Sequence, residues 1–200
     1  MKLLELFAGT KSVGKVAHEL GWEVVSLDLQ GADINCDILD WNYREYPSGC
    51  FDIIWASPPC NTFSRLRRAW IGRSGYTAES IERDIEEIGL PILRRTLEII
   101  DYFKPTYYYI ENPQTGRMKD YMQEYAHYDV DYCQYSDWGY RKRTRIWTNL
   151  KGFVPRKCHQ HCVNKIDGKH KTNLEGWGPT SLQERYRVPP MLIKELFGRG

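Results

Sequence analysis

Apolar and polar residues along this chain alternate between two patterns, short apolar runs and longer segments with helical spacing. Short apolar runs bounded by turn residues predict buried strands, whereas apolar residues that recur every three to four positions predict helices. In the first half of the chain the predicted strands cover 3–7, 22–27 and 51–56, and a predicted helix covers 12–20. A long helix is predicted over 78–103, where Gly89 and Pro91 should kink or split it.

The second half of the chain continues this alternation. Strands are predicted over 106–110, 128–135 and 145–150, and a final helix near 190–197. Strands that alternate with helices are typical of an α/β fold with a mostly parallel sheet and helices on both faces. Since no helix separates the last two strands, they should form an antiparallel hairpin at an edge of the sheet. The expected organisation is a core over 1–150, an irregular insertion over 151–180 and a return to the core over 181–200.

Composition agrees with one globular domain. The chain has 200 residues, of which 42% are hydrophobic and 27% charged. No apolar run approaches the roughly 20 residues of a membrane-spanning helix. The apolar N-terminal stretch contains an acidic residue, so it predicts a strand rather than a signal peptide. The six cysteines are therefore expected to be reduced thiols, and the expected location is the cytoplasm or the nucleoid, not the cell exterior.

The net charge of +2 conceals an uneven distribution. Four arginines and no acid lie within 61–73, and ten basic residues accompany a single acid within 141–171. The segments before and between these two islands are net acidic. Basic islands on an acidic body favour a polyanion bound across one face. A solvated charged surface is the alternative interpretation.

Two predicted strand ends carry groups suited to a nucleotide. The first strand runs into F-A-G-T, where Gly9 permits a tight turn and amides at a helix N-terminus favour anionic oxygens. The second strand ends at Asp28, 19 residues after Gly9, where such folds bind a ribose hydroxyl. Asp37 and Ile38 follow, a carboxylate and an apolar residue that suit an adenine ring. Each acid alone could be a loop cap, but their order predicts an adenosine-bearing cofactor.

The third strand runs into the polar loop S-P-P-C-N-T-F-S, which places Cys60 where open α/β sheets bind their ligands. Two prolines stiffen this loop, and four arginines within the next 13 residues should favour the reactive thiolate. Glu111 follows the tyrosine-rich strand, where burial should raise its pKa and suit it to proton donation. The alternatives are a small buried cysteine and a strand-end salt bridge.

Six elements occur in an order that resembles the cytosine carbon-5 DNA methyltransferase family: L-F-A-G, D-I, S-P-P-C-N-T-F-S, E-N-P, Y-R-K-R-T-R and R-Y-R-V-P-P-M-L-I-K-E-L-F. The resemblance runs from Leu3 to Phe197 and is specific in combination rather than in any single element. It implies a Rossmann-like class I methyltransferase fold. It also implies transfer of methyl from S-adenosylmethionine to cytosine carbon-5 in DNA, through a covalent cysteine adduct on a flipped base.

The resemblance implies roles for particular residues. Cys60 would be the nucleophile, and Glu111 would be the acid that grips the cytosine. Arg143 and Arg145 would lie near the flipped base and its phosphate. The residues implied for the cofactor pocket are Phe7, Ala8, Gly9, Thr10, Asp28, Leu29, Asp37, Ile38, Ser57 and Pro58. The residues expected to contact nucleic acid are Arg65, Arg67, Arg68, Trp70, Arg73 and Arg141.

The chain departs from the family pattern in three places. Thr10-Lys11-Ser12 replaces the usual glycine-rich continuation of the cofactor loop, and Arg141 stands where the family has glutamine. Only about 40 residues separate Arg145 from the C-terminal element at Arg185, too few for the family's target-recognition domain. We therefore expect weak or very short sequence specificity, carried by 151–180 and by 65–73.

Two features of the basic islands allow more than one interpretation. Cys158, Cys162 and His170 have a spacing that can hold zinc. The loose C-x-x-x-C pattern nevertheless favours a basic loop with free thiols, so no metal is expected. Trp70 lies among arginines, where it either stacks on a base or packs beneath its loop.

Two other functions stay open at this point. The same chemistry on RNA, such as a transfer-RNA loop, is compatible with a small recognition region. A non-catalytic nucleic-acid-binding or partner subunit on a methyltransferase scaffold is also possible, although the intact Cys60 and Glu111 argue against it. The compact size resembles enzymes encoded by phages and large DNA viruses, which would place the protein in the cytoplasm of a host cell.

Overall fold

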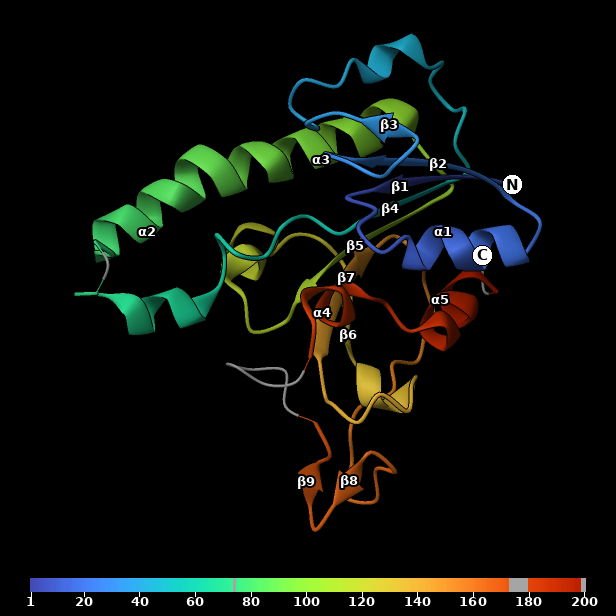
Figure 1. Cartoon of the computed structure of the whole chain (residues 1–200). Coiled ribbons are helices and arrows are strands. Elements are labelled where there is room, and N and C mark those ends of the chain that lie inside the picture. The colour runs from blue at the N-terminus through green and yellow to red at the C-terminus, as the bar shows by residue number, and fades with distance from the viewer. Residues whose placement is uncertain (74, 173–179, 199–200) are drawn as a thin grey trace.

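A seven-stranded sheet with helices on both faces forms the centre of the molecule (Figure 1). The computed structural model describes residues 1–73, 75–172 and 180–198. The strands of the sheet are β1 (Lys2–Leu6), β2 (Glu23–Asp28), β3 (Ile34–Asn35), β4 (Ile53–Ala56), β5 (Tyr107–Pro113), β6 (His127–Asp131) and β7 (Arg143–Thr148). Their order is β3-β2-β1-β4-β5-β7-β6. The predicted Rossmann-like α/β fold is confirmed.

Strand direction follows the prediction in most of the sheet. The pairs from β3 through β5 are parallel, and β7 runs antiparallel to both β5 and β6. The antiparallel pairing of the last two strands is thus confirmed. Because β7 inserts between β5 and β6, however, only β6 of these two strands lies at an edge of the sheet. Since the parallel strands share one direction, the loops that follow β1, β2, β4 and β5 lie at one edge of the sheet.

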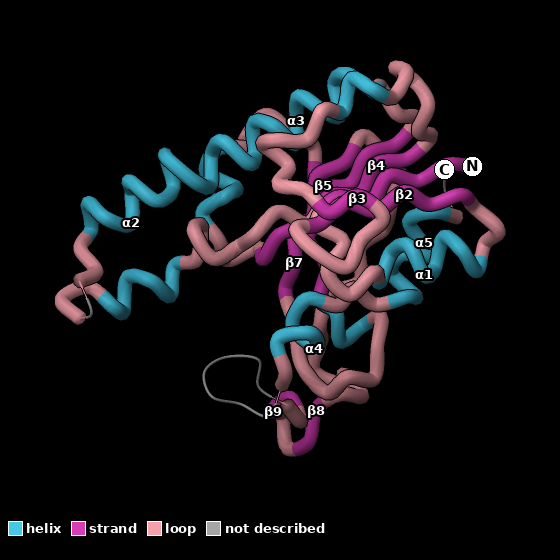
Figure 2. The backbone as a smooth tube through the Cα atoms, turned by 45° about the horizontal axis from the view of Figure 1, so that its top comes forward, coloured by secondary structure: helices cyan, strands magenta, loops and turns pink. Residues whose placement is uncertain are grey.

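Helices cover the two faces of the sheet differently (Figures 1 and 2). The α-helices are α1 (Ser12–Glu19), α2 (Ala78–Asp84), α3 (Leu90–Phe103), α4 (Leu182–Tyr186) and α5 (Pro190–Phe197). Short 3-10 turns are η1 (Tyr43–Glu45), η2 (Arg65–Trp70), η4 (Arg117–Tyr121) and η5 (Tyr132–Gln134). One face packs against α3 and the other against α1 and α5, so each face has its own apolar core. No helix in the described part of the chain is long and apolar enough to cross a bilayer.

Aromatic side chains anchor both cores. On the α3 face, the rings of Phe51 and Phe103 meet edge to face with centroids 4.9 Å apart. On the other face, Trp22 stacks on Phe197 of α5, again with centroids 4.9 Å apart. Such pairs add to the free energy of burial. The C-terminal helix is therefore built into the core, as its apolar spacing predicts.

The long predicted helix is continuous rather than broken. A π-helical turn, η3 (Ile85–Gly89), joins α2 to α3, and Pro91 occupies the first turn of α3. Because the π turn shifts the hydrogen-bond pattern there, it accommodates a proline that an uninterrupted α-helix would resist. The predicted irregularity thus takes the form of a π turn.

Three local features differ from the sequence prediction. β5 continues through Pro113 instead of ending at Ile110, so Glu111 lies within the strand. The insertion contains a small hairpin, β8 (Lys165–Ile166) and β9 (Lys169–His170), where an irregular segment was expected. The short helix α4 was not predicted. The hairpin and α4 carry little hydrophobic periodicity, because α4 spans less than two turns and the hairpin contains only one pair of short strands.

Candidate active site

The loops expected to bind cofactor and substrate are tied together at the carboxyl edge of the sheet. The amide of Ser57 donates to the carbonyl of Leu6 (3.3 Å), which joins the loop after β4 to the end of β1. The Asn112 amide group donates to the carbonyl of Pro58 (2.8 Å), which joins that loop to β5. Residues far apart in the sequence therefore share one site.

The turn after β1 has an unusual backbone. Phe7, Gly9 and Lys11 have φ angles of 59°, 49° and 52°. Glycine adopts this left-handed region freely, whereas a bulky residue such as Phe7 does so only where its surroundings hold it. Strained backbone of this kind concentrates at ligand-binding turns. The Thr10 and Ser12 hydroxyls lie 2.6 Å apart within the same turn.

Glu5 anchors the helix that follows this turn. Its two carboxylate oxygens accept hydrogen bonds from the amides of Val13 (3.2 Å) and Gly14 (2.9 Å) in the first turn of α1. Burial raises the pKa of Glu5 to about 7, and these two hydrogen bonds oppose the rise. The approach is close, because a Cβ added at Gly14 would lie 2.6 Å from a Glu5 oxygen.

Two carboxylates lie near the ends of the next strands, Asp28 at the end of β2 and Asp37 just after β3. One oxygen of Asp28 accepts from the amide of Gly9 (2.8 Å) and the other from the amide of Leu29 (2.7 Å). The Leu29 side chain is 69% exposed. Asp37 is held by the amide of Leu39 (2.9 Å), and Ile38 between them is buried.

The chemistry of these groups fits an adenosine-bearing cofactor. Each carboxylate oxygen can accept more than one hydrogen bond, so Asp28 and Asp37 retain capacity for ribose hydroxyls and an adenine amino group. Leu29 offers exposed apolar surface at the same place. After β4, the Ser57 hydroxyl accepts from the indole of Trp55 (3.0 Å), which orients it at the strand end.

Cys60 is half-buried on the loop after β4. Burial raises the pKa of its thiol, the positive charge of Lys142 opposes that rise, and the negative charge of Glu111 adds to it. The sequence-based expectation that the four nearby arginines favour the thiolate is therefore wrong. Those arginines follow on η2 and beyond, and the cation that acts on the sulfur comes from the chain just before β7.

Glu111 meets two partners in the core of the site. Its side chain is buried, and one oxygen lies 3.1 Å from the Tyr132 hydroxyl and 3.3 Å from the Lys142 ammonium. Lys142 also donates to the carbonyl of Arg185 in α4 (3.0 Å). The structure thus brings Cys60, Glu111 and Lys142 together, a cysteine, a carboxylate and a cation.

Lys142 was not among the residues singled out from the sequence. It stands within Y-R-K-R-T-R, but only the two arginines of that element carried a family role. Side chains alternate along an extended chain, so Lys142 and its neighbour Arg143 point to opposite sides. No sequence signal shows which of the two sides faces Glu111.

Arg143 and Arg145 are engaged elsewhere. Arg143 forms two hydrogen bonds to Asp131 (3.0 and 2.9 Å), and Arg145 forms two to Asp129 (2.7 and 2.9 Å). Both carboxylates belong to the edge strand β6. These paired, charge-assisted contacts fasten β6 to β7, so both guanidinium groups already have carboxylate partners outside the group formed by Cys60, Glu111 and Lys142.

The predicted nucleic-acid contacts lie mostly at the surface. Arg67 pairs with Asp84, and its guanidinium lies 5.2 Å from the centre of the Tyr76 ring. Trp70 is 53% exposed, so it is not packed beneath its loop. The η2 and α2 region projects from the sheet (Figure 1). Of the predicted contacts, the exposed arginines are Arg65, Arg68, Arg73 and Arg141.

The cysteine and histidine residues of the insertion also come together. Cys158, Cys162 and His170 form a cluster with Cys133, which lies in η5 beyond the end of β6. Cys133 was not predicted as a member, because it stands 25 residues before Cys158 and no local spacing connects the two.

Comparison with known proteins places the chain in a family. No model of a protein family matches it. It is 49% identical to the probable DNA (cytosine-5)-methyltransferase of Frog virus 3 (isolate Goorha) over 210 aligned positions, which cover 98% of each chain. Among solved structures it is similar to the methyltransferase EhMeth of Entamoeba histolytica, with a TM-score of 0.52 and 12% identity.

That second likeness concerns the fold alone. It covers 77% of this chain, which spans 55% of the Entamoeba protein's length. The alignment with the viral protein extends over nearly the whole of both chains, from the turn after β1 to the C-terminal helix. From this similarity and from the residues gathered at the strand edge, the chain belongs to the cytosine carbon-5 DNA methyltransferase family.

Proposed function

We propose that this chain transfers a methyl group from S-adenosylmethionine to carbon-5 of a cytosine in DNA. The observation that carries the proposal is the meeting of Cys60, Glu111 and Lys142 beside the strained turn after β1. The name of the viral relative supports DNA as the substrate. A half-buried cysteine with a carboxylate and a cation beside it is the set that addition to a pyrimidine ring needs.

The cofactor would lie across the ends of β1, β2 and β4. Asp28 would accept the ribose hydroxyls, Asp37 the adenine amino group, and Ile38 would support the ring. The turn Phe7–Thr10, together with Leu29, Ser57 and Pro58, would line the rest of the pocket. S-adenosylmethionine supplies an electrophilic methyl group on a sulfonium sulfur.

The reaction divides into steps that these side chains can assist. The Cys60 thiolate forms a bond to carbon-6 of the cytosine while Glu111 delivers the proton that ring nitrogen 3 takes up. Carbon-5 would thereby become nucleophilic and take the methyl group, which leaves S-adenosylhomocysteine. A base then removes the proton from carbon-5 as the bond between sulfur and carbon-6 breaks. The Cys60 thiolate is restored, and the proton on ring nitrogen 3 returns to Glu111.

Lys142 connects the two acidic groups in this scheme. Its ammonium favours the thiolate of Cys60, which burial alone disfavours. It also offers a positive charge 3.3 Å from Glu111, so the carboxylate left after proton transfer is stabilised. Asn112 holds the loop that carries the thiol through its bond to Pro58.

The target base must leave the stack to reach a half-buried thiol, at a cost of a few kcal/mol. Contacts with the phosphates on either side offset this cost. Arg65, Arg68, Arg73 and Arg141 are the exposed residues proposed for such contacts, with Trp70 as a stacking surface. Arg143 and Arg145 would bind the phosphate of the flipped base only after breaking their hydrogen bonds to Asp131 and Asp129.

A mechanism-based crosslink tests the proposal. Duplex DNA with 5-fluorocytosine in place of cytosine carries fluorine instead of hydrogen on carbon-5. A base then finds no proton to remove there, so the adduct should persist with cofactor present. We expect a covalent complex that survives denaturation with the wild-type chain, and none with Cys60→Ser. The matched control is Cys50→Ser, a half-buried cysteine before β4, which should crosslink like the wild type.

The outcome separates the alternatives. A crosslink to fluorinated RNA but not to DNA would mean that RNA is the substrate of the same reaction. Absence of a crosslink to both the DNA and the RNA substrate, with folded protein and bound cofactor, would overturn the proposed activity.

Bisulfite sequencing tests sequence specificity separately. A random duplex treated with the wild-type chain should show methylation in a short sequence context. Confinement to a long site would contradict the role proposed for the small insertion.

A further inference from the structure

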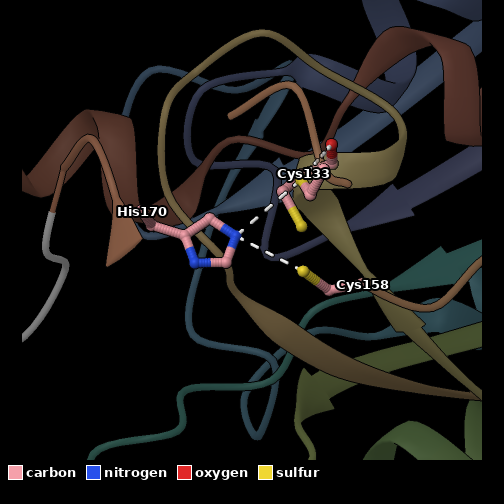
Figure 3. A group of neighbouring side chains, drawn as sticks. Cys133, Cys158 and His170 are labelled. Atoms are coloured by element: carbon pink, nitrogen blue, oxygen red, sulfur yellow. Dashed lines mark hydrogen bonds between the residues drawn. The ribbon is translucent and has the colours of Figure 1, made fainter. Parts of the chain in front are cut away.

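Three cysteines and a histidine converge outside the proposed active site. Figure 3 shows Cys133, Cys158 and His170 of this group. The sulfur atoms of Cys133, Cys158 and Cys162 and a ring nitrogen of His170 all lie within 4.8 Å of one another. All three cysteines are free thiols. The proposed methyl transfer uses none of these four residues, so their assembly requires a separate explanation.

The separations are close to those of a four-coordinate zinc site. Zinc bonds of about 2.3 Å to sulfur and 2.0–2.1 Å to nitrogen, arranged as a tetrahedron, put ligand atoms about 3.5–3.8 Å apart. Nε2 of His170 lies 3.5 Å from the sulfur of Cys158 and 4.0 Å from that of Cys162. Small rotations of the side chains would therefore enclose an ion.

The fold builds this cluster from two parts of the chain. Cys133 comes from η5, directly after the sheet strand β6. The other three residues come from the insertion, and His170 is placed by the hairpin β8–β9. The turn of this hairpin is Asp167-Gly168, whose φ angles of 49° and 76° suit a tight two-residue connection of the type I′ class.

Hydrogen bonds hold the two parts in register around the cluster. The buried side chain of Asn164 donates to the carbonyls of Cys133 and Ser136, both at 2.8 Å, and accepts from the amide of Gly139 (3.0 Å). Gln134 donates to the sulfur of Cys162 (3.2 Å). Supporting contacts of this kind orient metal ligands and stabilise thiolate sulfur.

The insertion needs such a link because it has little core of its own. Between 151 and 172 the buried apolar side chains are Phe153 and Cys162. Segments this small rarely hold a fixed conformation by burial alone, and a metal is a common substitute for an apolar core. A disulfide would satisfy only two of the three sulfurs and leave the histidine without a role.

The geometry points to a structural zinc ion bound by Cys133, Cys158, Cys162 and His170, which joins the basic insertion to the sheet. Three thiolates and one imidazole are a ligand set typical of structural zinc. Cys133 and Cys162 are buried, whereas Cys158 and His170 are partly exposed, so the ion can enter from the side of the insertion. All four positions are protein ligands, which leaves no open position for catalysis.

Elemental analysis of the full-length protein, purified in reducing buffer without chelator, tests this site. We expect about one zinc per chain, absent from Cys133→Ser, Cys162→Ser and His170→Ala. His170→Cys should retain zinc, because a fourth thiolate can replace the imidazole. The matched control Cys50→Ser should also retain it. A chelator should lower the melting temperature of the wild type but not that of Cys162→Ser.

Cobalt substitution gives a spectroscopic measurement on the wild-type chain, with His170→Cys as a comparison. Tetrahedral cobalt(II) bound to thiolates has intense visible absorption, and the band should shift in His170→Cys. Folded wild-type protein with no zinc, no cobalt band and a melting temperature insensitive to chelator would overturn the site. Zinc retained by all the cluster variants, or a disulfide within the cluster in protein purified under nitrogen, would also overturn it.

Discussion

Lys142 lies 3.3 Å from Glu111 and acts electrostatically on Cys60, so one ammonium serves both groups of the proposed active site. In the described part of the chain, Glu111 has no second basic side chain as an ion-pair partner within 4.0 Å. The pKa of a buried thiol depends strongly on the charges next to it. Single residues at this site should therefore have effects on reactivity that exceed their effects on folding.

Lys142→Gln should slow alkylation of Cys60. Removing the cation leaves burial and the Glu111 charge to raise the pKa of the thiol further, so less thiolate exists at pH 8. Each unit of pKa corresponds to about a tenfold change in thiolate fraction, and we expect alkylation to slow by about three- to tenfold. Peptide mapping by mass spectrometry after timed exposure to iodoacetamide measures the rate at Cys60 alone. Lys151→Gln, an exposed control, should leave that rate unchanged.

Glu5 should make stability depend on pH. Its pKa rises from about 4.5 to about 7 on folding, so the folded chain holds a proton that the unfolded chain releases. The stabilisation is fully present below about pH 4.5 and is lost as pH rises through 7. Relative to Glu5→Gln, the wild type should lose about 2–3 kcal/mol of unfolding free energy between pH 5 and pH 8.

Urea unfolding of both proteins at pH 5, 6, 7 and 8 measures this difference. Glu124→Gln removes an exposed carboxyl and serves as the control, since its curve should stay parallel to that of the wild type. A constant difference between the wild type and Glu5→Gln across the range would show that Glu5 keeps an ordinary pKa.

At the scale of elements, the continuous helix from α2 to α3 supports the loop that carries Cys60. Gly89, in the π turn, lies so close to this loop that an added Cβ would stand 2.8 Å from both the Phe63 ring and the Thr62 hydroxyl. From the other side, the amide of Arg117 donates to the carbonyl of Phe63 (2.8 Å). The helix and the segment after β5 thus hold the loop between them.

Gly89→Ala should disturb the loop. Overpacking a buried contact costs about 1–3 kcal/mol, while replacing a helical glycine by alanine returns about 1 kcal/mol. We expect a net loss of up to about 2 kcal/mol of unfolding free energy and reduced crosslinking of Cys60 to fluorinated DNA. Ile88→Ala, at an exposed neighbouring position, is the control for both measurements. Equal behaviour of the two variants would mean that the loop adjusts without cost.

At the scale of the whole molecule, two basic projections extend from an acidic body. One is the region of η2 and α2, and the other is the insertion that carries β8 and β9 (Figure 1). If the first projection binds phosphates, removing any one of its exposed arginines should reduce the salt dependence of DNA binding. DNA affinity should therefore depend on how the folded chain arranges its basic side chains, and not on one residue alone.

Arg68→Gln should weaken DNA binding uniformly across sequences. Without this phosphate interaction, the slope of log affinity against log salt should fall by about one. Fluorescence anisotropy with a labelled duplex at several salt concentrations measures this slope. Arg94→Gln, on the exposed side of α3, is the control and should keep the wild-type slope. If both variants keep it, η2 does not contact the phosphates.

Local sequence patterns were sufficient to predict the fold class, the strands at the centre of the sheet, the C-terminal helix and the family. Hydrophobic periodicity is a local property of the chain, and it survives in any tertiary environment that buries one face. Motifs such as S-P-P-C also carry their chemistry in consecutive residues. Cys60 and Glu111 could therefore be proposed as site residues without any knowledge of their neighbours.

Which side chains meet could be learned only from the folded chain. β7 inserts between β5 and β6, and this order sets Lys142 against Glu111 and gives Arg143 and Arg145 their carboxylate partners. In the same way, Cys133 joins Cys158 across 25 residues because the insertion folds back on η5. Such contacts depend on strand order and on the side of the strand that a residue occupies. Neither can be predicted from the spacing of residues along the chain.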